Sequence, residues 1–418
     1  MKKKVAITGI GMVSPLGIGA RINWEKLKNG ITGIGRAEFT GSDAFPHSMC
    51  GMVPEFDPTE YIANLKLLKL MNNESMLGAV AAKLALEDAG IGNTYAPEQQ
   101  GLYFGAGLTS GELSDLLPLV EDSLDEQGNF SYYHMGTNAL PNCNPLLSFK
   151  ILTNMPLCYI SILFNIKGPN LIFNPWSSRT AQAIGEGMRA IQEGELECAV
   201  VGGCDSKSNY AGFLIFSKLG LLSAKGICCP FNRRRDGIIL SEGATVLVLE
   251  DFAKAHERGA NIYAELAGYG NTTSPTTDKY WVDDPAVLVR TIEIALADAG
   301  ITANDIDYVC ASASSVPEGD MVEAQALETV FKESPAIIGS VKGHVGDMLA
   351  AASPFALATA CLALKEQIVP PLLNFEQSEE DIVLRFCGSS AENQKLRAVL
   401  VNAFEMGNAK VSIIVRNV

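Results

Sequence analysis

A repeated stretch of sequence constrains the fold of this chain more than any other feature. Residues 84–91 read LALEDAGI, and residues 294–301 read IALADAGI. Each copy is typical of a helix that ends just before a glycine, because glycine tolerates the left-handed backbone that follows a helix. An apolar strand follows each copy after a short gap, at residues 101–105 and at residues 307–311. A helix-then-strand unit in both halves of the chain predicts a duplicated α/β architecture.

Other segments indicate a buried sheet with helices around it. Residues 181–193 have the pattern of an amphipathic helix that ends at Gly194, and residues 350–365 are rich in alanine and leucine, as a buried helix would be. Residues 244–250 form a continuous apolar run. Strands without polar alternation are typical of a sheet that is buried on both faces, and we expect such a sheet here.

The length and composition are sufficient for a large core. The chain has 418 residues, of which 47% are hydrophobic. Such a length would suggest two or three domains, but no linker rich in proline, serine or glycine is present. No uncharged apolar run reaches the roughly 18–20 residues of a membrane span. The first strand-like segment also has no small-residue cleavage site, so we expect no signal peptide.

Charge and cysteine usage exclude several classes of function. The net charge of −15 argues against nucleic acid and against anionic membranes as partners. The ten cysteines include no CxxC pair and no metal-ligand spacing, so we expect reduced core residues in a cytoplasmic protein without a metal. Residues 9–17 begin like a dinucleotide-binding loop but lack its third glycine and its later acidic residue, so we expect no NAD and no other cofactor.

Five motifs together carry a resemblance to a known family. Residues 5–17 fit a first strand and turn, and residues 168–187 fit a short strand, a sharp turn and a helix. The others are VGGCD at 201–205, CPFNRRRDG at 229–237 and SEGA at 241–244. In this order the motifs resemble those of the β-ketoacyl synthases, the condensing enzymes of the thiolase superfamily. The resemblance covers nearly the whole chain.

The resemblance implies a specific fold. Its fold class is α/β, with the thiolase-like five-layer α-β-α-β-α arrangement built from two duplicated halves. We expect an N-terminal half over residues 1–250 and a C-terminal half over residues 251–418, with the boundary near residues 250–260.

The resemblance also implies a nucleophile that this chain does not have. The family holds its acyl chain on a cysteine at the sharp turn, where a helix N-terminus lowers the thiol pKa. Here that position is Ser177. A hydroxyl is much harder to ionise than a thiol and needs an adjacent base, usually histidine. Trp176 precedes it in place of a small residue. Two interpretations of Trp176 stay open: it fills the space of an acyl chain, or it is ordinary core packing.

Two histidines that the family uses are replaced as well. In the family they donate hydrogen bonds to the enolate that forms when malonyl loses carbon dioxide. The resemblance aligns Ser312 with the first histidine and Asp347 with the second, and it retains Lys342. An ionised aspartate cannot donate, and losing one preorganised donor typically costs ~3–4 kcal/mol of transition-state stabilisation. His344 would take the second position only in a shifted register that misplaces the residues after it.

The C-terminal turn has changed too. Residues 402–410 read NAFEMGNAK where the family has a glycine-rich turn, and Glu405 and Asn408 stand where it has glycines. Glycine is used where φ is positive or where backbones approach closely, so we expect a relaxed oxyanion-hole geometry. We therefore expect no intact catalytic residue in this chain.

Family members without the nucleophile are best known as chain length factors of type II polyketide synthases, although their usual replacement is glutamine. The resemblance implies a heterodimer with an active ketosynthase α subunit and contact with an acyl carrier protein through that complex. The growing poly-β-keto chain would lie in a tunnel at the interface. The sequence favours neither an aromatic polyketide nor a polyene as the product.

The resemblance also suggests tunnel and interface positions. The tunnel candidates lie near the start of a helix after residues 105–107 and at the sharp turn: Thr109, Leu113, Leu116, Leu117 and Trp176. A plain helix core would explain the same leucines. The strand with Leu171 and Phe173 should pair with the equivalent strand of the partner, and residues 130–147 should approach that subunit.

Other functions stay open at this point. In one, Ser177 is a nucleophile in an acyl-transfer, hydrolase or malonyl-decarboxylating enzyme, with Asp347 as its base. In another, the chain binds or stores acyl groups as a homodimer. The run Arg233 to Arg235 is a candidate basic patch for an acidic carrier protein, or else it pairs with nearby acids in a structural turn.

Overall fold

The computed structural model describes residues 2–45, 48–108, 113–274 and 284–418. Its main feature is one continuous sheet with the strand order β11-β10-β14-β15-β9-β1-β8-β7-β5-β6, and β2 pairs with β1 as a short hairpin. The strands of the N-terminal half are β1 (Val5–Ser14), β2 (Gly17–Ile18), β5 (Gln100–Ala106), β6 (Asn170–Phe173), β7 (Cys198–Ser206) and β8 (Glu242–Asp251). Those of the C-terminal half are β9 (Ala264–Thr273), β10 (Tyr308–Cys310), β11 (Ile337–Gly339), β14 (Ala398–Ala403) and β15 (Ala409–Arg416).

The two halves repeat one strand pattern. In the N-terminal half β5 is parallel to β6 and to β7, and β8 is antiparallel to β7 and to β1. In the C-terminal half β10 is parallel to β11 and to β14, and β15 is antiparallel to β14 and to β9. Antiparallel pairing of β1 with β9 joins the halves. The duplication predicted from the helix repeat is therefore present at the level of strand order.

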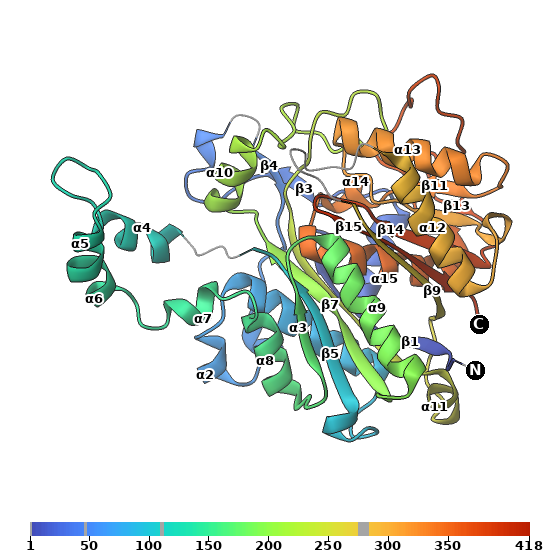
Figure 1. The fold of residues 1–418 in the computed structure, drawn as a ribbon, viewed down its shortest axis with the longest axis horizontal. Helices are drawn as coiled ribbons and strands as arrows, with labels where there is room; N and C mark the ends of the chain where they lie inside the picture. The colour runs from blue at the N-terminus through green and yellow to red at the C-terminus, as the bar shows by residue number, and fades with distance from the viewer. Residues whose placement is uncertain (1, 46–47, 109–112, 275–283) are drawn as a thin grey trace.

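The helices form three layers around the strands (Figure 1). The outer helices of the N-terminal half are α3 (Asn73–Ala89), on β1 and β8, and α8 (Met155–Phe164), on α3. Those of the C-terminal half are α12 (Pro285–Ala299), on β9 and β15, and α13 (Pro317–Phe331), on α12. Between the halves lie α9 (Ser177–Glu193) and α15 (Ala352–Glu366), which contact each other and strands of both halves. This arrangement confirms the expected five-layer fold class.

Corresponding glycines let each outer helix approach its sheet. A Cβ added to Gly11 would lie 2.0 Å from the carbonyl oxygen of Ala81 in α3. A Cβ added to Gly270 would lie 2.2 Å from the carbonyl oxygen of Thr291 in α12. Both distances are far shorter than any non-bonded contact, so only glycine allows these two helices to pack where they do.

The central helices are buried along most of their length. The helical stretch Leu349–Glu366, which includes α15, is long and apolar enough to cross a membrane, but 89% of it is buried inside the fold. Here it serves as a core helix. The division of the chain expected near residues 250–260 stays a prediction; in that stretch α11 (Phe252–Glu257) connects β8 to β9.

One part of the N-terminal half projects away from the body (Figure 1). We call residues 113–152 the arm; it contains α4 (Leu113–Glu121), α5 (Tyr132–His134), a π-helical turn (Met135–Ala139), α6 (Leu140–Asn142) and α7 (Leu147–Ile151). Its exposed apolar side chains are Leu117, Val120, Phe130, Tyr132, Tyr133, Leu140, Leu146, Phe149 and Leu152. The aromatic rings of Phe130 and Tyr132 meet edge to face, and the Tyr132 and Tyr133 side chains are 84% and 74% exposed.

The remaining elements connect these layers. They include α1 (Ala20–Lys28), α2 (Leu65–Leu68), α10 (Tyr210–Lys218), α14 (Lys342–Val345), and the small pairs β3 (Ile34–Arg36) with β4 (Met49–Gly51) and β12 (Ile368–Val369) with β13 (Glu392–Asn393). Short 3-10 turns complete the described structure: Ser42–Ala44, Pro58–Glu60, Pro97–Gln99, Ala303–Asp305 and Leu349–Ala351.

Candidate functional site

Ser177 begins the central helix α9, directly after a turn that follows β6. The preceding residue, Trp176, has φ 76° and ψ 160°, so the chain reverses sharply between strand and helix. This is the strand-turn-helix that the sequence predicts. Ser177 is only 1% exposed, and among the described residues its hydroxyl has no hydrogen-bond partner. Its carbonyl oxygen accepts a hydrogen bond of 2.8 Å from Ser353 Oγ at the start of α15.

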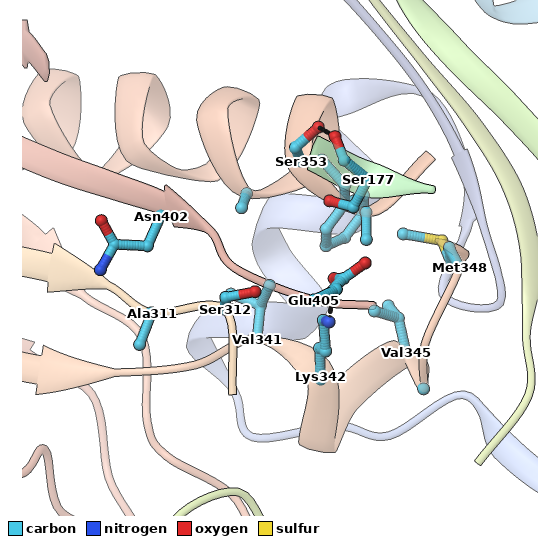
Figure 2. Close-up of a pocket in the computed structure, with 14 residues that line it drawn as sticks. Ser177, Ala311, Ser312, Val341, Lys342, Val345, Met348, Ser353, Asn402 and Glu405 are labelled. Carbon is cyan, nitrogen blue, oxygen red and sulfur yellow. Dashed lines mark hydrogen bonds and ion pairs between the residues drawn. The ribbon is translucent and has the colours of Figure 1, made fainter. Parts of the chain in front are cut away.

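A small cavity lies beside Ser177 (Figure 2). Its volume is about 10 Å³, about what one water molecule needs. The walls come from both central helices, from α14 and from the ends of β10 and β14: Ser177, Ala311, Ser312, Val341, Lys342, Val345, Gly346, Met348, Ala352, Ser353, Phe355, Ala356, Asn402 and Glu405. A cavity of this size has no room for an acyl thioester.

Three buried charged side chains fill the region under Ser177. Lys342 Nζ donates to a carboxylate oxygen of Glu405, and it lies 3.2 Å from Asp347 Oδ2. All three side chains are at most 5% exposed. In the view of Figure 2, the Glu405 carboxylate lies between the side chains of Ser177 and Lys342. Glu405 therefore occupies space at the position where the family has a glycine.

Burial and charge act on this group in opposite directions. Burial and the nearby Asp347 together raise the pKa of Glu405 to about 8, while Lys342 opposes the rise. Burial alone would lower the pKa of Lys342, but Asp347 and Glu405 together raise it above its ordinary value. The ammonium group is thus held between two acids and is not free to bind a negatively charged substrate.

Asp347 is held by backbone contacts as well. Its Oδ1 accepts a hydrogen bond of 2.9 Å from the N–H of Leu349, and its own backbone bridges to Leu240. It is absent from the cavity wall. The sequence aligned Asp347 with a catalytic histidine, but in this structure Glu405 lines the cavity and Asp347 only supports Lys342. An Asp347 base acting on Ser177 is therefore disfavoured.

Ser312 has a structural partner. Its Oγ accepts a hydrogen bond of 2.9 Å from the N–H of Phe404, and its own N–H donates to Glu323 Oε1 at 3.0 Å. Asn402 Nδ2 donates to the same Glu323 oxygen at 3.0 Å. The position aligned with the first histidine therefore joins the turn after β14 to α13, and its hydroxyl is engaged there.

Lys410 organises the same turn, although the sequence analysis did not single out its role. It is fully buried, and its ammonium donates to the carbonyl oxygens of Phe404, Glu405 and Gly407 at 3.2, 2.6 and 2.8 Å. Burial lowers its pKa to about 8. The available signal was a lysine within an apolar strand, but nothing in the sequence indicated the carbonyl groups that it would meet.

His344 points away from the cavity. Its Nδ1 lies 3.0 Å from the carbonyl oxygen of Ile31, and its Nε2 lies 2.9 Å from that of Pro371. It is fully buried, and burial lowers its pKa. The shifted register that would make His344 a catalytic group is not what the structure has.

The predicted tunnel residues that the structure describes are absent from the cavity wall. Leu113 and Leu116 are half-buried and Leu117 is 43% exposed, all on α4 of the arm, which contacts the π-helical turn. Thr109 lies outside the described residues. Trp176 is half-buried and packs on the other side, against a cluster that includes Phe216. Their role in a tunnel stays a prediction.

The predicted interface strand lies at the end of the sheet. β6 pairs with β5 on one side, and Leu171 is 47% exposed. Phe173, in contrast, packs against the main core cluster. Among the described residues, no strand pairs with the other side of β6.

The arginine run forms a structural turn rather than a free basic patch. Arg234 pairs with Glu376 at 2.9 Å, and Arg235 pairs with Glu379 at 3.0 Å. Arg235 also donates to the carbonyl oxygens of Asn232 and Pro317. The second of the two interpretations of this run, pairing with nearby acids, fits the structure.

Metal ligation has no candidate in the described part of the chain. No group of three or more His, Cys, Asp or Glu side chains there is arranged to hold an ion. All ten cysteines are free thiols, and eight of them are buried, while Cys143 and Cys158 are half-buried.

Comparison with known proteins gives two family matches. The beta-ketoacyl synthase N-terminal domain matches residues 2–255, and the beta-ketoacyl synthase C-terminal domain matches residues 263–376. Among curated relatives, the 3-oxoacyl-[acyl-carrier-protein] synthase 2 of Vibrio harveyi is 29% identical over 432 residues, covering 100% of this chain and 99% of its own. The mitochondrial 3-oxoacyl-[acyl-carrier-protein] synthase of Arabidopsis thaliana is 29% identical over 445 residues, covering 99% and 93%.

Several solved structures have the same fold. One described as the ishigamide ketosynthase/chain length factor has a TM-score of 0.89 and 25% identity, covering 100% of both chains. A beta-ketoacyl synthase from Burkholderia phymatum has a TM-score of 0.87 and 26% identity over the same coverage. A ketosynthase chain of the AntDE:AntF complex, at 23% identity and a TM-score of 0.85, is alike in fold.

Proposed function

This chain belongs to the β-ketoacyl synthase family, and we propose that it is a non-catalytic chain length factor, the partner subunit of an active ketosynthase. In this role it would complete an interface tunnel that sets the length of a poly-β-keto chain in type II polyketide biosynthesis. Its curated relatives at 28–29% identity are described as 3-oxoacyl-[acyl-carrier-protein] synthases, so the proposal depends on how this chain differs from a catalyst.

The observation that carries the proposal is the state of the site around Ser177. Among the described residues no histidine lines the cavity of this serine, and the cavity has room for about one water molecule. The ammonium group of Lys342 is held between Asp347 and Glu405. A decarboxylative condensation needs a thiolate and free donors for an enolate; among the described residues the cavity wall contains no cysteine, and its ammonium group, that of Lys342, is paired with acids.

The surface supports a partner subunit. β6 presents an open edge with Leu171 exposed, and unpaired strand edges readily pair with strands of another chain. The arm adds large apolar and tyrosine side chains that a monomer rarely exposes together, and tyrosine is enriched in protein interfaces. Both features belong to the N-terminal half, as expected for one contiguous interface.

The kind of partner is suggested by similar structures. A neighbour at 25% identity is described as a ketosynthase/chain length factor, and another is described as a carrier protein in complex with its ketosynthase. By analogy we propose an active ketosynthase α subunit as the partner and contact with an acyl carrier protein through the complex. Thr109, Leu113, Leu116 and Leu117 remain the proposed tunnel residues, because they precede or begin the arm.

Native mass spectrometry of this chain, expressed alone and together with a ketosynthase encoded beside it, tests the proposal. We expect a one-to-one heterodimer and a poorly soluble chain when it is expressed alone. A stable homodimer that ignores the ketosynthase would contradict the proposal. Labelling of Ser177 by an acyl or malonyl probe would instead favour the alternative of a serine-dependent acyl-transfer, hydrolase or decarboxylating enzyme.

A further inference from the structure

We infer that Trp176 closes this chain's own route to Ser177, so that a carrier-bound acyl group is excluded from this subunit by access as well as by chemistry. The inference deepens the proposed function, on which it rests for the identity of the excluded ligand. The closure itself depends only on the contacts of Trp176. For Trp176 the sequence leaves two interpretations open: the side chain fills the space of an acyl chain, or it is ordinary core packing.

The position of Trp176 is the one where a ligand would enter. In α/β folds, ligands bind in the crevice outside the carboxyl ends of the strands. α9 follows the carboxyl end of β6, and α10 (Tyr210–Lys218) follows the carboxyl end of β7. Trp176 stands at the start of α9, immediately before Ser177, and its ring meets α10.

The indole contacts both sides of the crevice. Its ring meets the ring of Phe216 on α10 edge to face, with centroids 6.1 Å apart and an interplanar angle of 90°. A Cβ added to Gly407 would lie 3.1 Å from Trp176 Cδ1, so the indole also rests on the turn between β14 and β15. Met406 and Leu349 belong to the same apolar cluster. The indole thus spans from the N-terminal half to the C-terminal half.

The backbone at this residue is a second and independent observation. Trp176 has φ 76°, a conformation that is cheap for glycine and costly for a bulky residue, on the order of 1–3 kcal/mol. A glycine would make the same turn without that cost. The strain is tolerated because the indole gains contacts on two sides. The contacts of the side chain, rather than the backbone conformation, therefore favour tryptophan at this position.

The result of the closure is visible at Ser177. The serine is 1% exposed, although it begins a helix next to a crevice. Behind it the cavity has a volume of about 10 Å³. The nucleophile position is thus almost inaccessible to solvent, and restoring a cysteine there would not by itself restore access. If the proposed function holds, a carrier protein can load only the partner subunit.

Thiol labelling of the full-length chain tests the closure directly. In Ser177→Cys, we expect iodoacetamide to alkylate the introduced thiol at least about 100-fold more slowly than Cys143, because labelling must wait for a local opening. A thiol at a helix N-terminus is otherwise more reactive than usual, so slow labelling reports lack of access. The rates are measured for each peptide by mass spectrometry. Labelling of the introduced thiol as fast as that of Cys143 would overturn the inference.

Two double variants sharpen the test. Trp176→Gly with Ser177→Cys should bring the labelling rate of the introduced thiol within about tenfold of that of Cys143, since local closure no longer protects it. Trp176→Phe with Ser177→Cys should stay slow, because a large ring remains between α10 and the β14–β15 turn. An unchanged rate in the glycine variant would contradict the assignment of the closure to Trp176.

An internal control shows whether a variant has simply lost its fold. Cys361 lies in α15 and is fully buried, so its labelling should stay slow in every folded variant. Phe216→Ala with Ser177→Cys opens the same crevice from the opposite side and should speed up the labelling of the introduced thiol but not that of Cys361. If native mass spectrometry finds no heterodimer while the introduced thiol stays protected, the proposed function fails and the closure stands.

Discussion

β11 and β6 lie at opposite ends of the same sheet, and they differ in what covers them. Residues 385–387 run along β11: Ile338 N–H donates to the carbonyl oxygen of Arg385, and Cys387 N–H donates to that of Ile338, both at 2.8 Å. All three residues of β11 are buried. β6 has no such cover among the described residues, and half of its residues are exposed. The fold closes one end of its sheet with its own chain and, among the described residues, leaves the other end without a strand partner.

Away from these edges, the two halves are closely matched. Gly11 and Gly270 admit α3 and α12 in the same way. Each half also holds a buried lysine near two carboxylates beyond a strand end: Lys207 lies 2.7 Å from Asp205 and 4.0 Å from Glu74, while Lys342 contacts Asp347 and Glu405. Because the cores agree, the difference between the two edges reflects what each half does rather than how it folds.

The largest expected effect tests whether the matched cores of the two halves contribute equally to the stability of the chain. We expect Gly11→Ala and Gly270→Ala each to lower the free energy of unfolding by about 3–5 kcal/mol or to prevent folding, since the added methyl would overlap a helix carbonyl. Urea denaturation of the purified chain, with its partner where it needs one, measures this. Gly388→Ala, whose Cβ meets nothing within 4 Å, is the control and should change little. If one of the two glycine substitutions were tolerated and the other were not, the two cores would not contribute equally to stability.

The next effect separates the two edges. Leu171→Lys places a charge on the open edge, and we expect it to weaken association with the ketosynthase by at least about tenfold with little change in the stability of this chain. Val383→Lys is the matched control: Val383 is 65% exposed and lies next to the segment that covers β11. Analytical ultracentrifugation of the mixed subunits measures both. Equal weakening by the two substitutions would show that β6 is not the interface.

A smaller effect concerns how the stability of the fold depends on pH through the acids beside the two buried lysines. Burial raises the pKa of Glu405 from 4.5 to about 8 and that of Glu74 from 4.5 to about 7. The folded chain therefore holds protons that the unfolded chain has lost, and each acid contributes stability at low pH that is lost as pH rises through its window. Lys410, with its pKa lowered to about 8, acts in the opposite direction above that pH.

Two substitutions separate the pH ranges over which Glu405 and Glu74 each affect stability. Relative to the unmodified chain, Glu405→Gln should lose less stability between pH 4.5 and pH 8, and Glu74→Gln should lose less between pH 4.5 and pH 7. Unfolding free energies at a series of pH values, at constant ionic strength, measure the slopes. Parallel curves for the variant and the unmodified chain would mean that the acid titrates alike in the folded and unfolded states.

The smallest expected effect concerns the arginine turn in the C-terminal half. Arg234 and its partner Glu376 are 51% and 69% exposed, and such pairs typically contribute about 0–1 kcal/mol. We expect Arg234→Gln to leave the melting temperature and carrier-protein binding nearly unchanged. Surface plasmon resonance with the carrier protein and the assembled heterodimer measures the binding. A large loss of binding would make this turn a docking site after all.

The sequence predicts much of the framework because its signals are local. The helix repeat ends at Gly90 and Gly300, and both have the left-handed backbone that such an ending requires, with φ 60° and φ 67°. The helix predicted to end at Gly194 does so, and the apolar run at residues 244–250 lies within β8. In these cases the pattern and the packing depend on the same few neighbouring residues.

The site is harder to predict because its contacts join distant parts of the chain. The sequence aligned Asp347 with a catalytic position, but the structure places Glu405, 58 residues further along, in the cavity wall. The three carbonyl acceptors of Lys410 lie in a turn whose shape depends on the whole C-terminal half. The two interpretations of Trp176 could be separated only once α10 and the β14–β15 turn were placed around it.

The open edge of β6 also bears on how much of this chain a cell can hold. An unpaired strand edge in a chain that also exposes an apolar arm is a template for self-association, and a surplus of such chains would aggregate or be degraded. Synthesis in step with whatever molecule covers that edge would keep the surplus small. On the proposed function, the sheet that supports the fold would thereby make the copy number of this protein dependent on that of its partner.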